Sequence, residues 1–363
     1  MKKYSNTRAT LAIAAASFRS IIRSPSAVVF SLAFPLIFIV VFANVGGSAV
    51  TVDVGVAKTC DTTGPVYKIL QNTKVVHLIK SQSTVEMEKN LSKGNIDAII
   101  NIQKNNGRPL YSLHIKYTSA SMQKDAILKS LLNSVFYQLN SQGGNQPMAV
   151  ADIKETTIQG REYKYIDFLL PGMLGFSLLS SGVFGTAFVF LSLRLTLVVK
   201  RFFATPVKKY SIVLGEALAR LVFSWIGALF IILVGHFAFG FTLIHGAVTV
   251  INMLILAAIG LIVFMGFGFI ISGVAKNEST VPPLSNIITM PQFLLSGTFF
   301  ATTAFPTWLQ SLSNILPLTY LNKAMRDVAF EGAGLGDVTK DLLVLGIWFV
   351  IVYAVAVKTF KWE

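Results

Sequence analysis

Residues 248–273 read VTVINMLILAAIGLIVFMGFGFIISG and contain no lysine, arginine, aspartate, glutamate or histidine. A helix needs about 20 consecutive apolar residues to cross the roughly 30 Å hydrocarbon core of a bilayer, and this run is long enough. The composition of the whole chain agrees: 53% of its 363 residues are hydrophobic and 13% are charged, whereas soluble domains carry about 25% charged residues. We therefore expect an α-helical membrane protein.

Further apolar runs extend this pattern along the chain. They are residues 27–45, 168–193, 212–239, 281–300 and 342–357. The run 281–300 is the weakest because it contains Pro282, Pro283 and Pro291, so we expect a bent or partly unwound helix there. The run 27–45 is longer than the roughly 7–15 apolar residues of a signal peptide, which favours an uncleaved anchor. The sequence thus predicts six transmembrane helices.

The stretch 305–329, before the last predicted span, is apolar but is interrupted by Pro306 and Pro317. Proline removes a backbone donor and interrupts a helix. We therefore expect short re-entrant helices in the outer leaflet here, rather than a further span.

Basic residues in four places indicate the orientation of the spans. The N-terminal segment and the loop 194–209 contain several lysines and arginines and no acidic residue, Lys276 lies between the fourth and fifth spans, and Lys358 follows the sixth. Six spans would place all four positions on one side, and the positive-inside rule makes that side cytoplasmic. We expect a multi-pass membrane protein with both termini in the cytoplasm.

The polar stretch 46–166 would then form a small α/β extracytoplasmic domain. Alternation of apolar and polar residues predicts strands at 50–57, 75–79, 98–102 and 110–117, and helical spacing predicts helices at 83–91 and 122–139. Ser83 with Glu86 three residues later forms a capping-box pattern at the first helix. Residues 141–147 are rich in glycine, glutamine and asparagine and predict a linker. The element order βαβαββα indicates an α/β domain large enough to bury its own core.

These predictions divide the chain into four parts. Residues 1–25 form a cytoplasmic amphipathic interface helix, 26–45 the first transmembrane helix, 46–166 the extracytoplasmic domain, and 167–363 the remaining five transmembrane helices with the loop 194–209.

The sequence offers no chemistry for an enzyme. It contains no G-x-x-x-x-G-K-[ST] phosphate loop, no G-x-S-x-G elbow and no H-E-x-x-H pair, so we expect no catalytic residues and no ATP site of this type. The four histidines lack metal-ligand spacing, and Cys60 is the only cysteine, so no metal site is expected. The net charge of +14 lies mostly beside apolar runs, which favours membrane flanks over nucleic-acid binding.

Glu216 and Arg220 are the exceptional ionisable residues within the predicted spans. They lie one helical turn apart and can form an ion pair. One interpretation is an interfacial anchor for the third span, and the other is a role in coupling helix motion to a cytoplasmic partner. The scarcity of mid-membrane charges disfavours an ion-coupled carrier and favours an external motor.

Three groups of residues resemble the ABC type-2 permease family, also called type V ABC exporters. The first is YIDFLLPG at 165–172, and the second is KRFFATPV at 200–207 followed by Gly215. The third comprises LSGTFF at 295–300, FPTWLQ at 305–310 and LPLTYL at 316–321. The large domain after the first span is similar to that of a subgroup of multidrug, antibiotic-resistance and lipid-related exporters. Family members often have a glutamate where this chain has Leu195, which leaves open the salt bridge such a glutamate would make.

The resemblance implies the location of this chain, the bacterial inner membrane, and its partners. Two permease copies, identical or paralogous, would pair, and each would dock a separate cytoplasmic ABC ATPase subunit that binds ATP and Mg, so this chain itself needs no cofactor. The stretch 7–24 and the loop 194–209 would receive the push from the ATPase, although anchoring to membrane lipid headgroups is an alternative role for their charges. The expected coupling residues are Arg19, Arg23, Arg194, Lys200, Arg201, Thr205 and Pro206.

The substrate path would lie at the dimer interface between the first, second and fifth spans. Its expected apolar and aromatic lining is Phe34, Phe38, Phe176, Phe184, Phe293 and Phe299. Such a lining suits an amphipathic or lipid-like substrate, so the sequence predicts an exporter of a drug, an antibiotic or a lipid. The alternative is a membrane-anchored sensor or assembly scaffold in which the extracytoplasmic domain binds a ligand.

Overall fold

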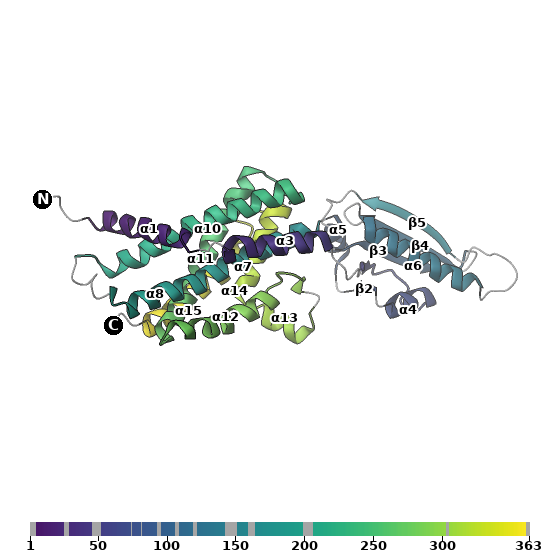
Figure 1. Cartoon of the computed structure of the whole chain (residues 1–363). Coiled ribbons are helices and arrows are strands. Elements are labelled where there is room, and N and C mark those ends of the chain that lie inside the picture. Colours follow the sequence, from purple (N-terminus) through teal and green to yellow (C-terminus); the bar gives the residue numbers. More distant parts are fainter. Residues whose placement is uncertain are drawn as a thin grey trace. The chain divides into compact units, whose positions relative to one another are not determined.

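The structure is a computed structural model of the chain, which divides into two compact units: Met1–Gly46 with Tyr165–Glu363, and Gly47–Lys164 (Figure 1). It describes residues 5–24, 29–45, 52–73, 75–80, 82–92, 96–105, 109–118, 122–141, 151–158, 164–198, 206–302 and 305–360. The predicted coupling residues Lys200, Arg201 and Thr205 and most of the predicted linker 141–147 lie outside these ranges.

The first unit is helical. Its elements are α1 (Asn6–Ile22), η1 (Val29–Ala33), α3 (Phe34–Val45), α7 (Tyr165–Ser180), η3 (Ser181–Gly185), α8 (Thr186–Leu195), α10 (Lys209–Phe239), α11 (Ala247–Val274), η4 (Glu278–Thr280), α12 (Val281–Leu295), α13 (Thr307–Ser313), α14 (Pro317–Arg326), η6 (Asp327–Glu331) and α15 (Thr339–Thr359). The elements η1, η3 and η6 are π-helical turns that continue into neighbouring α-helices.

Among the described residues, four helices are long and apolar enough to cross a membrane. They are Tyr165–Leu195, Lys209–Phe239, Ala247–Val274 and Thr339–Thr359, and they match four of the six predicted spans. The other two predicted spans correspond to η1 with α3 and to α12, which has 15 residues. A total of six spans therefore stays a prediction.

The prolines of α12 act differently from one another. Pro282 and Pro283 lie in the first turn, where proline is tolerated, and Pro291 lies inside the helix. The helix ends at Leu295 and not at residue 300 as predicted, because the chain turns at Gly297, whose φ is +70°. A side chain disfavours this left-handed conformation, which glycine adopts readily. Beyond the turn, α13 and α14 are the short helices expected in 305–329.

The helix α11 is the most buried of the four long helices. It packs against α7, η3, α8 and α15, and its glycines lie where these neighbours approach. A Cβ atom on Gly268 would lie 2.6 Å from Cβ of Thr186 and 2.8 Å from the carbonyl oxygen of Gly182. Small residues let membrane helices approach closely enough for dispersion contacts, which explains why the C-terminal end of the apolar run 248–273 is rich in glycine.

The second unit is a five-stranded mixed sheet with helices. Its elements are β1 (Val52–Val56), α4 (Pro65–Asn72), β2 (Val76–Ile79), α5 (Thr84–Ser92), β3 (Ala98–Lys104), β4 (Tyr111–Thr118), α6 (Met122–Ser141) and β5 (Ala151–Ile158). The strand order is β2-β1-β3-β4-β5, with β3 and β4 antiparallel and the other pairs parallel. Figure 1 shows α6 lying along this sheet.

Alternation places the core of the α/β unit on one face of the sheet. Val54, Ile100 and Ile115 are buried there against residues of α4 and α6, such as Leu70 and Leu132. The opposite face is covered in part by α5, whose Met87 and Leu91 pack on Ile99. The predicted strands and helices are therefore confirmed. The strand β5 was not predicted, and the helix α4, which the predicted order includes, was not assigned to residues, so the order is βαβαββαβ.

The predicted N-cap of α5 is present, because the Ser83 hydroxyl accepts a hydrogen bond of 3.3 Å from the Glu86 backbone N–H. Such a cap satisfies one of the backbone donors that a helix start leaves unpaired.

Candidate transport path and coupling elements

Six phenylalanine rings gather between α3, α7, α12 and the segment after α12. We call them the aromatic cluster: Phe34, Phe38, Phe42, Phe176, Phe293 and Phe299. The closest ring centroids are those of Phe176 and Phe293 at 4.1 Å, Phe34 and Phe38 at 4.5 Å, and Phe293 and Phe299 at 4.9 Å. Each side chain remains partly exposed, so the cluster is an aromatic surface of the helical unit.

The structure brings together five of the six predicted path residues. Phe184 is not one of these rings and lies in the π-helical turn η3. Phe42, which the prediction omitted, joins the cluster through Phe38 and Phe299, at 5.9 and 5.4 Å. Residues four apart lie on one face of a helix, so the spacing of Phe34, Phe38 and Phe42 was a signal that could have identified the third ring.

Arg194 lies at the end of α8 and contacts the end of α11. Its guanidinium donates hydrogen bonds to the carbonyl oxygens of Gly273, at 3.4 Å, and of Ala275. A cation at a helix C-terminus satisfies free carbonyls and complements the helix dipole. Arg194 therefore joins two helix ends. Of the other predicted loop residues, Pro206 is described and exposed.

The helix α1 packs along the first half of α10 (Figure 1). The contact is close at Gly215, where a Cβ atom would lie 2.7 Å from Cγ2 of Ile13 and 3.0 Å from the carbonyl oxygen of Thr10. Further along, Ile21 packs with Phe223. Arg19 and Arg23, two of the predicted coupling residues, are exposed. One face of α1 is thus attached to α10, and its arginines remain available to a partner.

The predicted ion pair between Glu216 and Arg220 is present and buried. Oε1 of Glu216 lies 2.8 Å from Nη2 of Arg220, and the two side chains are 3% and 5% exposed. The guanidinium also donates to the carbonyl oxygens of Ser181, at 3.3 Å, and Gly185, at 2.5 Å. Both carbonyls belong to η3, and π-helical turns leave backbone groups without their α-helical partners. Arg220 thus fastens α10 to the irregular middle of the α7–α8 helix.

The contact between Arg220 and η3 is possible because residue 185 is a glycine. A Cβ atom there would lie 1.8 Å from Nη1 of Arg220, so any side chain would displace the guanidinium. Sequence inspection found the ion pair from its i,i+4 spacing. It did not find η3, because the residues SGVFG at 181–185 carry no pattern that distinguishes a π-helical turn from an α-helix.

The stretch that begins α7 contacts distant segments. Asp167 is buried, and its carboxylate accepts hydrogen bonds from the Thr242 backbone N–H at 2.7 Å and hydroxyl at 3.3 Å. Five residues later, Gly172 faces Thr298, whose carbonyl oxygen would lie 2.7 Å from an added Cβ. These contacts account for the aspartate and the glycine of the YIDFLLPG stretch.

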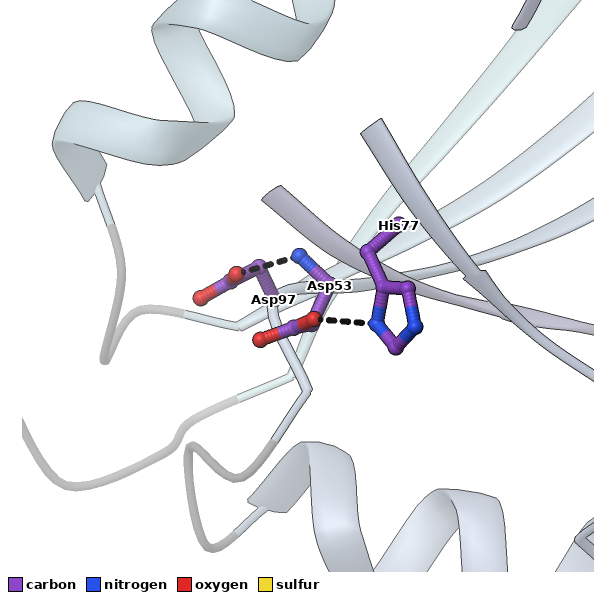
Figure 2. Close-up of polar contacts among 3 residues, drawn as sticks. All are labelled: Asp53, His77 and Asp97. Carbon is purple, nitrogen blue, oxygen red and sulfur yellow. Dashed lines mark hydrogen bonds and ion pairs between the residues drawn. The ribbon is translucent and has the colours of Figure 1, made fainter. Parts of the chain in front are cut away.

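The α/β unit has one small polar cluster on β1, β2 and the residue before β3. Nδ1 of His77 lies 2.9 Å from Oδ1 of Asp53, and the Asp53 backbone N–H donates to Oδ2 of Asp97 at 2.8 Å. Figure 2 draws both contacts. His77 is 65% exposed, and exposed ion pairs contribute little to stability. Within the described ranges, no three His, Cys, Asp or Glu residues are arranged to hold a metal.

Long apolar helices with buried polar residues between them are typical of a multi-pass membrane protein. Residues 25–358 match the family described as ABC-2 family transporter protein, and the chain therefore belongs to the ABC-2 family of transporter membrane proteins. The membrane domain of this family lacks the ATPase, and the chain matches this permease part of the transporter. Permeases of this family work with an ABC ATPase subunit.

Two relatives show how far the similarity extends. The chain is 26% identical over 372 residues to ABC transporter G family member 20 of Dictyostelium discoideum, an alignment that covers 96% of this chain and 50% of that protein. It is 24% identical over 205 residues to the inner membrane transport permease YadH of Escherichia coli K12, which covers 55% of this chain and 75% of YadH. The chain thus spans about half the length of its Dictyostelium relative.

Proposed function

We propose that this chain is the membrane-spanning permease of an ATP-driven exporter that moves an amphipathic or lipid-like substrate, such as a drug, an antibiotic or a lipid, from the cytoplasm or the inner leaflet. The observation that carries the proposal is the aromatic cluster. Its rings come from three helices and one turn and stay partly exposed. Aromatic faces bury a large apolar area and need no specific polar partner, so this surface suits the apolar part of such a substrate.

A second permease copy, identical or paralogous, would complete the path. The helices that carry the cluster also present apolar side chains outward, such as Ile37 and Val41 on α3 and Met290 and Leu294 on α12, which are 48–59% exposed. Within one helical unit the aromatic cluster is partly exposed. Contact between the outward surfaces of two permease copies would enclose it.

A separate ABC ATPase subunit would dock at the end of the helical unit that carries α1, Arg194 and the loop after α8. Its ATP and Mg would supply the energy, and a push on α1 would reach α10 at Gly215. Glu216 and Arg220 follow directly on α10, and Arg220 would pass the displacement to η3. This arrangement supports a coupling role for the ion pair and for Arg19 and Arg23, while the exposed arginines can also contact lipid headgroups.

The orientation we propose places this basic end in the cytoplasm and the α/β unit outside the cytoplasmic membrane of a bacterium. The lysines and arginines of α1, of the loop after α8 and of the C-terminal end of α15 support it. A similar location is part of the name of YadH, an inner membrane transport permease.

The test uses the permease with its ATPase subunit in lipid vesicles, with a nitrobenzoxadiazole-labelled phosphatidylethanolamine and rhodamine 6G as probes. The double substitution Phe176→Ala and Phe293→Ala should lower kcat/KM for at least one probe about tenfold, since removing two partly exposed rings of the cluster costs roughly 1–2 kcal/mol of substrate contact. Phe237→Ala on α10, whose side chain is 80% exposed, is the matched control. Equal transport by the two variants would contradict the proposed path.

A sensor or assembly scaffold is the competing function, and the separate core of the α/β unit is compatible with it. Deletion of residues 50–160 distinguishes the two. An exporter would retain nucleotide hydrolysis by the assembled complex, because the helical unit and its docking end are untouched. A scaffold would lose its activity with the α/β unit.

A further inference from the structure

The chain leaves α12 at Leu295, and the next few residues hold an unusual set of side-chain hydrogen bonds. Four backbone carbonyls between residues 295 and 299 each accept a hydrogen bond from a side chain of a distant segment. We call the four donors the carbonyl clamp: Ser313 to Leu295 at 2.6 Å, Asn322 to Ser296 at 3.1 Å, Arg326 to Gly297 at 2.5 Å, and Tyr165 to Phe299 at 3.0 Å. The donors belong to α7, α13 and α14.

The physical reason for the clamp is the cost of an unpaired carbonyl. A segment that leaves a helix loses its internal hydrogen bonds, and in a lipid environment no water replaces them, at a cost of several kcal/mol for each group. Side chains from other helices therefore satisfy these oxygens. Because the four donors are anchored on three different helices, the bonds also fix where the segment lies.

Arg326 makes the most connections within the clamp. Its Nε donates to the carbonyl oxygen of Phe168 at 3.0 Å while Nη2 reaches Gly297, and its guanidinium lies 3.7 Å from the centre of the Phe168 ring. A planar guanidinium can donate in two directions and stack on a ring at once, whereas a lysine ammonium cannot reproduce this geometry. Arg326 on α14 thus ties the turn at Gly297 to α7.

The clamp decides the position of Phe299. Its carbonyl is held by Tyr165, and its ring contacts the aromatic cluster, at 4.9 Å from Phe293, 5.4 Å from Phe42 and 5.7 Å from Phe38. On the other side, α7 comes so close at Gly172 that the Thr298 carbonyl oxygen leaves no room for a Cβ. The turn can therefore move toward neither side without breaking these contacts.

We propose that Arg326, assisted by Tyr165, is a positioning residue of the permease that fixes Phe299 at one end of the aromatic cluster and so determines which apolar substrates the cluster accepts. The positional part of this inference stands on the geometry alone. The part that concerns substrates rests on the proposed export function, and the two parts have separate tests.

The first test measures position. In a Cys60→Ser background, cysteines replace Phe38 and Phe299, whose ring centroids lie 5.7 Å apart, and oxidative cross-linking is followed in lipid nanodiscs. Arg326→Gln removes two hydrogen bonds, which together contribute about 1–3 kcal/mol, so the cross-linking rate should fall about tenfold or more. The control pair replaces Phe34 and Phe176, at 5.5 Å, and its rate should not change.

If Arg326→Gln fails to fold, cross-linking of the control pair will slow as much as that of the 38–299 pair. In that case Tyr165→Phe provides the test. It deletes one hydroxyl and only the bond to Phe299, so the rate should fall about threefold. An unchanged rate for the 38–299 pair in folded Arg326→Gln, or in Tyr165→Phe, would overturn the positioning role.

The second test measures transport by the complex with its ATPase subunit. Arg326→Lys keeps the charge but loses the two-directional geometry, so KM for the labelled phosphatidylethanolamine should rise at least about fivefold with kcat changed less than about twofold. A merely structural role would lower the amount of active protein, hence kcat, and leave KM unchanged. Slower cross-linking with unaltered KM would retain the positioning role and contradict the proposed substrate path.

Discussion

Both units of the chain bury an apolar core, but they differ in the side chains that they expose. In the α/β unit, apolar residues such as Val54, Ile100 and Leu113 are fully buried, and its exposed pairs are charged, as for Lys129 and Glu155. In the helical unit, Phe237 and Val357 are each 80% exposed while Asp167 and Asn322 are fully buried. The same physical chemistry explains both, since each unit exposes what its solvent tolerates. The difference is the one expected if water surrounds the α/β unit and lipid surrounds the helical unit.

The largest expected effect comes from breaking the ion pair inside the helical unit. Glu216→Ala would leave the Arg220 guanidinium buried without its counter-charge, and loss of one partner from a buried pair costs about 3–5 kcal/mol. The matched control is Lys129→Ala in the α/β unit, where both partners are at least 40% exposed and the expected loss is below about 1 kcal/mol. Thermal unfolding of each variant in nanodiscs measures its loss of stability. Similar losses of stability for the two variants would contradict a buried pair in one unit and an exposed pair in the other.

A pair of aspartate substitutions tests the comparison directly. Ile347→Asp places a carboxyl group at a side chain of α15 that is 58% exposed, near the middle of a predicted span, where the cost is about 2.5–3.5 kcal/mol. Val85→Asp changes a side chain of α5 that is 78% exposed. In water this change costs little, and in the first turn of a helix a negative charge is favourable.

The measurement for this pair is the yield of folded protein in membranes together with its unfolding temperature. We expect a clear loss for Ile347→Asp and none for Val85→Asp. If both variants were equally stable, the outward face of α15 would not face lipid.

A smaller effect is expected where α1 meets α10. Gly215→Ala would place a Cβ 2.7 Å from Ile13 and 3.0 Å from the Thr10 carbonyl oxygen, and such overpacking costs about 1–3 kcal/mol. Under the proposed coupling, transport per ATP hydrolysed by the complex should also fall, because α1 shifts on α10. Gly336→Ala is the control, since nothing lies within 4 Å of the added atom. A stable Gly215→Ala variant with unchanged coupling would remove α1 from the coupling path.

The two units also differ in how well their sequences predicted them. The lengths and hydrophobicity of the spans depend only on local composition, and so four long helices were found from apolar runs. In the α/β unit, alternation at 52–56 and 111–118 identified strands for the same reason. The strand β5 was missed because ADIKETTI at 151–158 is mostly polar and lies at the edge of the sheet, where only its register with β4 identifies it.

The candidate site was predicted less completely than the fold. The i,i+4 spacing of Glu216 and Arg220 is local, and so the ion pair was expected. The carbonyl clamp joins Tyr165, Ser313 and Arg326 to one turn that lies 134, 18 and 29 residues away from them in sequence, and no periodicity connects such positions. Long-range hydrogen bonds of this kind depend on how helices pack, which the pattern of a single segment does not contain.

The smallest expected effect concerns Cys60, the single cysteine of the chain. Burial is the main cause that raises the pKa of its thiol above the usual value of 9.0, although the Ile102 backbone N–H donates to Sγ and acts in the opposite direction. A raised pKa favours the protonated thiol in the folded state, so its contribution to stability is complete below about pH 9 and is lost as the pH rises further. The rate of labelling by a maleimide, which requires the thiolate, should therefore have its midpoint above pH 9 in the folded chain and near pH 9 in urea.

The same thiol tests on which side of the membrane the α/β unit lies. With the proposed orientation, a membrane-impermeant maleimide should label Cys60 slowly in intact cells and faster at higher pH. A cysteine introduced at Thr205 in a Cys60→Ser background should react only after the membrane is permeabilised. If position 205 were labelled from outside while Cys60 was protected until permeabilisation, the orientation would be the reverse of the one proposed. It would also move the proposed ATPase docking end to the wrong side of the membrane, because ATP is supplied from the cytoplasm.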